Sequence, residues 1–273
     1  MSTALFESSN GLHRVEDIMG MPIGIDLRDV DLDPSILDDA FAWLRQVDET
    51  FSTYKPESEM SRLNRGELRL DEADPEIRTV LQRCEQLRFQ TAGYFDARAA
   101  FWQGAARDRI QDPSPAAVDP SGLVKGWAVD RAGELLDAAG AHNYCINAGG
   151  DIRTRGAALP DPSWRVGILH PLQHDKVAAV VEANDLGIAT SGTYARGEHI
   201  VDPYNPTPPQ TVLSVTIVGP DLGTADAYAT AAFAMGEEGP EWTAGLAGYE
   251  AMTILANETV LFTPGFPRAP AEG

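Results

Sequence analysis

Hydrophobic residues recur along the first third of the chain with two different periods. Over 19–30 they alternate with small or polar residues, which predicts a β-strand. Over 33–51 they return every three to four residues, which predicts a helix that begins at an Asp-Pro pair. The segment 52–69 is polar and is expected to be irregular. A second helix is predicted to begin at Asp74 and Pro75.

The remainder of the chain mixes helical and strand patterns. A third helix is predicted over 125–139 and an alanine-rich helix over 224–235. Between them, 188–194 is small and polar. Strands are predicted at 144–147, 152–155, 164–169, 177–181, 213–218, 251–255 and 260–262. Paired strands with short turns indicate hairpins, so the expected class is α+β, with mixed, largely antiparallel sheets and packed helices.

One domain accounts for most of the chain. The 273 residues are 43% hydrophobic and 23% charged, which is typical of a globular protein. We expect an N-terminal extension over 1–18, a single domain over 19–266 and a tail over 267–273. No secretory signal or membrane-spanning run is visible, and Cys84 and Cys145 are expected to be reduced thiols. These features favour a cytoplasmic protein.

The net charge restricts the partners. The formal charge is −20, from 41 acidic and 21 basic residues. A nucleic acid or an anionic membrane requires a basic surface, so both are disfavoured as partners. A nucleotide held through a metal ion is still allowed, because the ion supplies the positive charge locally.

Two oxygen-bearing residues stand four apart on the alanine-rich helix. This spacing places Asp226 and Thr230 on one face. Carboxylate and hydroxyl oxygens are the ligands that magnesium prefers. Alternatively, Asp226 complements the helix dipole and Thr230 is a packing residue.

A glycine turn and a glycine-lysine segment are candidates for binding phosphate. In the segment 147–151, Gly149 and Gly150 allow close backbone approach to a ligand, although an ordinary hairpin turn has the same composition. In the segment 121–126, Lys125 lies at the start of the third helix, where phosphates often bind. The spacing is not that of a Walker motif, and a solvated lysine is the alternative.

Hydroxyl groups and a histidine follow later in the chain. The segment 190–194 contains Ser191, but the G-x-S-x-G pattern of a serine nucleophile is absent from it, and a polar loop is the alternative. His199 stands in the run His-Ile-Val-Asp-Pro and is a candidate base or phosphate ligand. A lone histidine more often has a structural role.

Taken together and in order, these segments resemble the ApbE family of FAD:protein FMN transferases. The resemblance covers about residues 19–266, and that family has a T-fold-like architecture. It is carried by Phe51-Ser52 with Ser58–Asn64, Gly93–Asp96, Asp119–Arg131, Asn147–Asp151, Ala189–Tyr194 with His199–Pro203, and Thr224–Gly236.

The resemblance implies a role for each matching residue. Magnesium would be held by the side chains of Asp226 and Thr230 and by the backbone carbonyl of Gly122. His199 would be the candidate base for the incoming hydroxyl, with Asp226 as the second catalytic residue. The residues implied to lie along or shape the FAD site are Lys125, Asp130, Asn147, Gly149, Gly150, Ser191 and His199.

The implied reaction is a magnesium-dependent transfer of FMN from FAD to a serine or threonine hydroxyl of an acceptor protein, with release of AMP. Two alternatives are left open by the sequence. One is hydrolysis of FAD to FMN and AMP at the same site, and the other is flavin binding without turnover.

This chain departs from the family pattern at two places within the matching segments. Pro120-Ser121 replaces an apolar-glycine pair before Gly122. After the His-Ile-Val-Asp-Pro run, the residues 204–209 replace the usual Thr-Gly or Ser-Gly. This second departure affects the loop geometry that docking of an acceptor protein would need.

Overall fold

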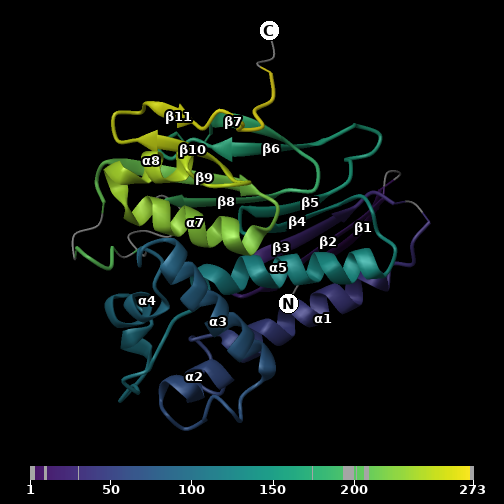
Figure 1. Cartoon of the computed structure of the whole chain (residues 1–273). Helices are drawn as coiled ribbons and strands as arrows, with labels where there is room; N and C mark the ends of the chain where they lie inside the picture. Colours follow the sequence, from purple (N-terminus) through teal and green to yellow (C-terminus); the bar gives the residue numbers. More distant parts are fainter. Residues whose placement is uncertain are drawn as a thin grey trace.

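Nine strands form one sheet in the order β1-β2-β3-β4-β5-β8-β9-β10-β11 (Figure 1). The computed structural model describes residues 4–8, 11–29, 31–173, 175–192, 200, 202–205 and 209–270. Every pairing in this sheet is antiparallel. Its strands are β1 (Ala4–Ser8), β2 (Gly11–Ile18), β3 (Met21–Leu27), β4 (Tyr144–Ala148), β5 (Asp151–Arg155), β8 (Gly187–Gly192), β9 (Val212–Gly219), β10 (Glu250–Leu255) and β11 (Val260–Phe262).

The helices gather on one face of this sheet (Figure 1). They are α1 (Ile36–Phe51), α2 (Glu59–Asn64), α3 (Pro75–Gln90), α4 (Ala97–Gln103), α5 (Ser121–Ala138), α7 (Leu222–Ala234) and α8 (Gly239–Ala244), with short 3₁₀ turns η1 (Arg107–Arg109) and η2 (Gly236–Glu238). Helix α7 packs on β8 and β9, and α5 packs on α7 and α1. None of the helices built from described residues is long and apolar enough to cross a membrane.

A separate two-stranded sheet covers part of the opposite face. Its strands are β6 (Trp164–Leu169) and β7 (Val177–Ala183), paired antiparallel. Trp164, Val166 and Val181 of this hairpin are buried in one cluster with Met252 and Ile254 of β10. The strands in this part of the sheet are therefore covered on both faces, which explains why β8 and β9 are buried along nearly their whole length.

The structure confirms the α+β class and most of the expected elements. The helix that begins at Asp74-Pro75 is α3, and the Asp74 carboxylate accepts a hydrogen bond from the backbone of Glu76. Gly149 and Gly150 form the turn between β4 and β5, with φ of 61° and 104°, as two-residue hairpins require. Both cysteines are free.

The two ends of the expected domain contribute to the sheets. Residues 11–18, expected to be an N-terminal extension, form β2, which pairs along its whole length with β3. Near the other end, Arg268 forms a β-bridge with Val181, and the backbone of Ala269 donates to Val180. The hydrogen bonds of both segments are therefore made within the folded chain.

Three local predictions were wrong, and one strand was not predicted. Helix α1 begins at Ile36, because the residues after Asp33 form a turn in which the Asp33 carboxylate accepts from the Ser35 backbone. The segment 52–69 contains α2, which is capped by the Ser58 side chain. Helix α5 begins at Ser121 and not at residue 125. The small, polar segment after Gly187 is strand β8.

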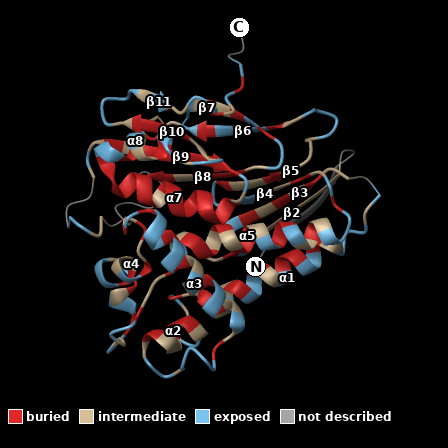
Figure 2. Ribbon diagram, in the orientation of Figure 1, coloured by how far each residue is buried: buried red, intermediate tan, exposed pale blue. Residues whose placement is uncertain are grey.

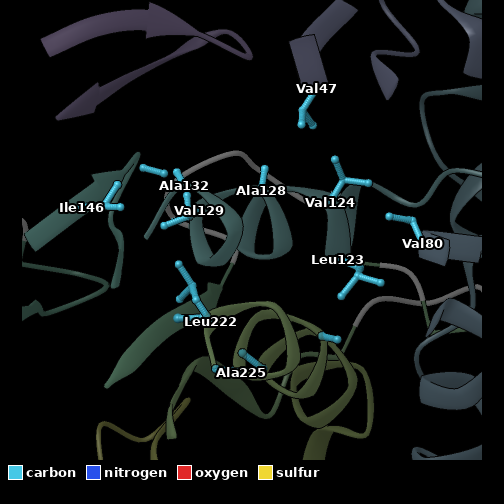
Figure 3. Close-up of a cluster of buried hydrophobic side chains, with 14 of the residues drawn as sticks. Val47, Val80, Leu123, Val124, Ala128, Val129, Ala132, Ile146, Leu222 and Ala225 are labelled. Carbon is cyan, nitrogen blue, oxygen red and sulfur yellow. The ribbon is translucent and has the colours of Figure 1, made fainter. Parts of the chain in front are cut away.

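Small residues let α5 and α7 approach closely. A Cβ atom on Gly126 of α5 would lie 2.7 Å from the carbonyl oxygen of Leu222 and 2.8 Å from the Cα of Gly223. Figure 3 shows α5 between Leu222 and Ala225 of α7 and Val47 of α1. Helix α7 is buried nearly all round, whereas α1 and α3 each keep an exposed side (Figure 2). The position of α7 therefore depends on α5.

We expect Gly126→Ala to lower the free energy of unfolding by about 1–3 kcal/mol, because the added methyl has no room between two backbones. Urea unfolding followed by circular dichroism measures this loss. Gly245→Ala, at the end of α8, is the matched control, because its Cβ would meet its nearest atom at 3.4 Å. Equal stability of the two variants would contradict the close-packing argument.

Candidate functional site

A pocket opens where the start of α5, the middle of α7, strand β8 and the β4–β5 turn meet. Most of the residues predicted from sequence to form the site contribute to it. The described residues that line it are Tyr94, Phe95, Asp96, Ala97, Ala99, Ala100, Asp119, Ser121, Gly122, Lys125, Gly149, Asp151, Thr190, Ser191, Gly192, Ile200, Pro203, Asp226 and Thr230.

Asp226 is a buried carboxylate on an otherwise apolar helix. Its residue is 6% exposed, and its neighbours on α7 are mostly buried alanines. A charge in such a place requires a partner. That partner is Lys125 of α5, whose Nζ lies 3.5 Å from Asp226 Oδ2.

Lys125 also forms an ion pair with Asp151, the first residue of β5. The second oxygen of Asp151 accepts a hydrogen bond of 3.1 Å from the backbone of Thr190 on β8. Asp151 is 3% exposed and lines the pocket, yet the sequence reasoning did not select it. The signal was present, because Asp151 completes the Asn-Ala-Gly-Gly-Asp segment that was selected for its glycines.

Three further oxygen-bearing or small residues meet beside Asp226. Thr230 follows one turn later on α7, and its hydroxyl lies 3.4 Å from that of Ser191 on β8. Gly122 lies in the first turn of α5, where an added Cβ would be 3.9 Å from Thr230 Oγ1. The structure therefore brings together the three residues predicted to hold a metal: Gly122, Asp226 and Thr230.

The donor set fits a hard cation. Asp226, Thr230 and Ser191 offer oxygen, and magnesium is typically bound by one or two carboxylates together with substrate phosphates and water. Within the described part of the chain, no group of three or more His, Cys, Asp or Glu residues is arranged to hold a metal. Oxygen donors of this kind suit a hard cation better than a soft metal.

Another part of the pocket lining is aromatic and acidic. Tyr94 and Phe95 line it, together with the carboxylates of Asp96 and Asp119. Asp96 caps α4 by accepting hydrogen bonds from the backbone of Arg98 and Ala99, so its carboxylate already has partners at the start of this helix. Burial raises the pKa of Asp119, although its hydrogen bond from the Ser121 backbone acts in the other direction.

The loop that departs from the family pattern is attached to this wall. The Tyr204 hydroxyl donates to the carbonyl of Ala92 at 2.6 Å, and its ring packs edge-on against Tyr94 with 5.1 Å between centroids. Gly93 has a φ of 87°, which favours glycine, and a Cβ there would lie 2.3 Å from that hydroxyl and displace the Tyr204 side chain. The substitution in this loop therefore forms a specific contact beside the pocket.

Asp130 is not among the residues that line the pocket. It lies at the N-terminal end of α7. Its two oxygens accept hydrogen bonds from the backbone of Leu222 and Gly223, at 3.0 and 2.8 Å. Arg153 lies 3.4 Å from the Asp130 carboxylate and also donates to the carbonyl of Pro220. Asp130 therefore fixes the N-terminus of α7, which carries Asp226.

Two other predicted site residues, Asn147 and Gly150, are not among those that line the pocket, and a third, His199, is not described. The Asn147 side chain accepts from the backbone of Gly150, and neither residue lines the pocket, whereas Gly149 of the same turn does. His199 lies outside the described residues, although its neighbour Ile200 lines the pocket. The predicted roles of these residues in binding FAD stay predictions.

The position of Asp130 makes stability depend on pH. Burial raises its pKa to about 6, against an ordinary value of 3.8, although its backbone hydrogen bonds and Arg153 act in the other direction. Between these two pH values, Asp130 is protonated in the folded state and ionised in the unfolded state. The free energy of unfolding therefore falls as the pH rises through this window, by up to about 3 kcal/mol.

We expect this decrease in the free energy of unfolding to disappear in Asp130→Asn, because asparagine cannot ionise. Urea unfolding of both proteins between pH 4 and pH 7 measures it. The wild-type free energy of unfolding, taken relative to that of the variant, should decrease as the pH rises. A difference that stays constant across the range would show that Asp130 titrates at its ordinary pKa.

Comparison with known proteins identifies the family. The profile of the ApbE family matches residues 19–102 and 99–253. The FAD:protein FMN transferase of Vibrio cholerae is 29% identical over 243 residues, which are 71% of this chain and 72% of that protein. The FAD:protein FMN transferase of Haemophilus influenzae is 28% identical over 72% of this chain and 71% of that protein.

Solved structures show the same fold. The flavin transferase ApbE from Vibrio cholerae superposes with a TM-score of 0.79 at 24% identity, over 97% of this chain and 99% of that one. The ApbE protein from Thermotoga maritima gives a TM-score of 0.79 at 21% identity, over 98% of this chain and 100% of that one. With the profile match across most of its length, the chain belongs to the ApbE family.

Proposed function

We propose that this protein is an FAD:protein FMN transferase, which moves FMN from FAD to a serine or threonine hydroxyl of an acceptor protein and releases AMP. One observation carries the proposal: Asp226 and Thr230 meet Gly122, Lys125 and Ser191 in a single pocket. The chain also belongs to a family whose members in Vibrio cholerae and Haemophilus influenzae are named FAD:protein FMN transferases.

The reaction would depend on magnesium. Asp226 and Thr230 would hold the ion by their side-chain oxygens, with the backbone carbonyl of Gly122 as a third protein ligand. When bound, the ion would offset negative charge on the diphosphate and on the departing AMP. A protein with a formal charge of −20 has few cations of its own for this purpose.

Other pocket residues would bind and orient FAD. Lys125 carries a positive charge into the pocket, and the Ser191 hydroxyl can donate a hydrogen bond to a phosphate oxygen. The turn at Gly149 lets the chain approach a ligand closely. Tyr94 and Phe95 form an apolar wall suited to the flat ring system of a flavin.

The transfer step then follows from ordinary phosphoryl chemistry. The acceptor hydroxyl oxygen forms a bond to the phosphorus of the FMN half. The bond from that phosphorus to the bridging oxygen breaks, and AMP leaves with this oxygen. His199, beside the pocket residue Ile200 in sequence, would accept the proton from the acceptor hydroxyl.

The acceptor would be a cytoplasmic protein or a segment that faces the cytoplasm. FAD hydrolysis and simple flavin binding use the same pocket, and one experiment separates all three functions. The protein is incubated with FAD and magnesium, with and without an acceptor peptide bearing serine and threonine. Acceptor-dependent AMP and flavin-labelled peptide indicate transfer, brisk AMP release without acceptor indicates hydrolysis, and intact FAD indicates binding alone.

We expect Asp226→Ala to reduce FMN transfer at least about 100-fold, because the main ligand of the metal is lost. The fold should persist, since alanine suits a buried helix and Lys125 retains Asp151. In-gel flavin fluorescence measures transfer, and circular dichroism measures folding. Asp161→Ala, at an exposed turn, is the control. Undiminished transfer by Asp226→Ala would overturn the metal assignment.

For His199→Ala we expect transfer to slow by about 10²–10⁴-fold while FAD still binds, because only the proton acceptor is removed. Flavin fluorescence titration measures the binding of FAD, and single-turnover labelling of the acceptor measures the rate. His142→Ala, an exposed histidine, should match the wild-type protein. If His199→Ala instead fails to bind FAD, the histidine is a binding residue and not the base.

A further inference from the structure

Lys125 is shared unequally between two buried carboxylates. Its Nζ is in close contact with Asp151 Oδ2 and lies 3.5 Å from Asp226 Oδ2. The Lys125 side chain is 17% exposed, and those of Asp151 and Asp226 are 4% and 9% exposed. Lys125 therefore supplies one positive charge to two of the pocket's carboxylates, and Asp226 is the more distant partner.

The two carboxylates differ in how firmly they are held. Asp151 starts a strand, and its other oxygen accepts a hydrogen bond from the Thr190 backbone. Lys125 can therefore keep this partner whatever happens at Asp226. A lysine ammonium is a compact charge on a flexible stem, and small rotations of the stem move it by an ångström or more.

A second cation at Asp226 would compete with Lys125. Two positive charges a few ångströms apart in a partly buried pocket repel each other by several kcal/mol. A metal ion that binds Asp226 therefore binds more weakly while Lys125 remains nearby. A diphosphate in the same pocket would draw Lys125 toward itself and relieve that repulsion.

We propose that Lys125 is an exchangeable counter-cation of Asp226. It weakens metal binding at Asp226 until the dinucleotide diphosphate binds. On binding of both ligands, Lys125 keeps Asp151, gives up Asp226 to the metal and turns to the diphosphate. Metal and FAD then favour each other's binding, and the coupling acts equally in both directions. This inference rests on the proposed metal site and adds an order of assembly to it.

The proposal requires opposite effects of one substitution on two ligands. In Lys125→Met the competing charge is gone, so the affinity for metal without FAD should rise at least about tenfold. The affinity for FAD without metal should fall, because the diphosphate loses a cation. A lysine that only supports the fold would lower both affinities.

Manganese(II) serves as the probe, since its free ion is counted directly by electron paramagnetic resonance. The titration is made on the wild-type protein, Lys125→Met, Lys125→Arg and the control Lys176→Met, an exposed lysine before β7. FAD binding is followed separately by flavin fluorescence, with AMP release monitored so that only intact FAD is scored. Lys176→Met should match the wild-type protein in both titrations.

Lys125→Arg gives a second result that does not depend on removing the charge. A guanidinium bridges two carboxylates more tightly than an ammonium, so manganese affinity should fall several-fold below that of the wild-type protein. Tighter manganese binding by Lys125→Met together with weaker binding by Lys125→Arg supports the exchange. Equal or weaker binding by Lys125→Met, or unchanged binding by Lys125→Arg, overturns it.

The same titrations separate this inference from the proposed function. If the wild-type protein binds no manganese with or without FAD, the metal site itself is wrong. If the wild-type protein binds manganese, Asp226→Ala does not, and Lys125→Met binds no more tightly than the wild type, the metal site stands. In that case Lys125 is a fixed residue and the exchange is rejected.

Discussion

A carboxylate buried within an apolar helix requires a cation at close range, and in this protein Asp226 imposes that requirement. Lys125 meets it only because α5 and α7 are close enough for a lysine to reach across. Gly126 makes this approach possible, since a Cβ there would collide with the α7 backbone, and Gly187 does the same for the approach of β8 to the start of α7. The alanines of α7 serve the same purpose along its length. Packing and site chemistry thus depend on one helix.

The pocket, like the whole protein, has more acidic than basic side chains. The pocket is lined by four aspartates but by a single lysine among the described residues. Asp96 is satisfied by the backbone of α4, and Asp151 and Asp226 share Lys125. An anionic ligand therefore enters a site in which the available positive charge is already in use. Additional positive charge has to arrive with the ligand, which is the physical argument for a divalent ion.

The sequence predicted the site best where chemistry depends on local spacing. Asp226 and Thr230 share a helix face whatever the rest of the fold does, and the glycines at 149 and 150 fit a turn of two residues. It did not predict the contacts of Asp130, because a carboxylate that caps another helix is recognised only from tertiary structure. Asp151 was missed for the same reason, since its partners lie on α5 and β8.

The errors in the fold also have tertiary causes. Strand β8 looked like a polar loop because its residues are small and bear hydroxyls. Small residues are needed there because α7 packs on one face of the strand. On the other face, Ile188 belongs to the hydrophobic cluster that it forms with residues of β6, β7 and β10. Helix α5 begins four residues before the predicted start, since the carbonyl of Pro120 accepts from Leu123 and Val124. These bonds are not evident from hydrophobic periodicity.

The N-terminus of α7 is not available to bind an anion, because its backbone amides already have partners. Asp130 accepts from the backbone of Leu222 and Gly223, and Asp221 accepts from that of Thr224. Two carboxylates thus occupy the amides and the positive dipole end that would otherwise attract phosphate. Under the proposed function, a diphosphate would therefore be held further along the helix, at the level of Asp226 and Thr230. In that stretch the Thr230 hydroxyl can donate to an anion directly, whereas the Asp226 carboxylate repels one unless a cation lies between them.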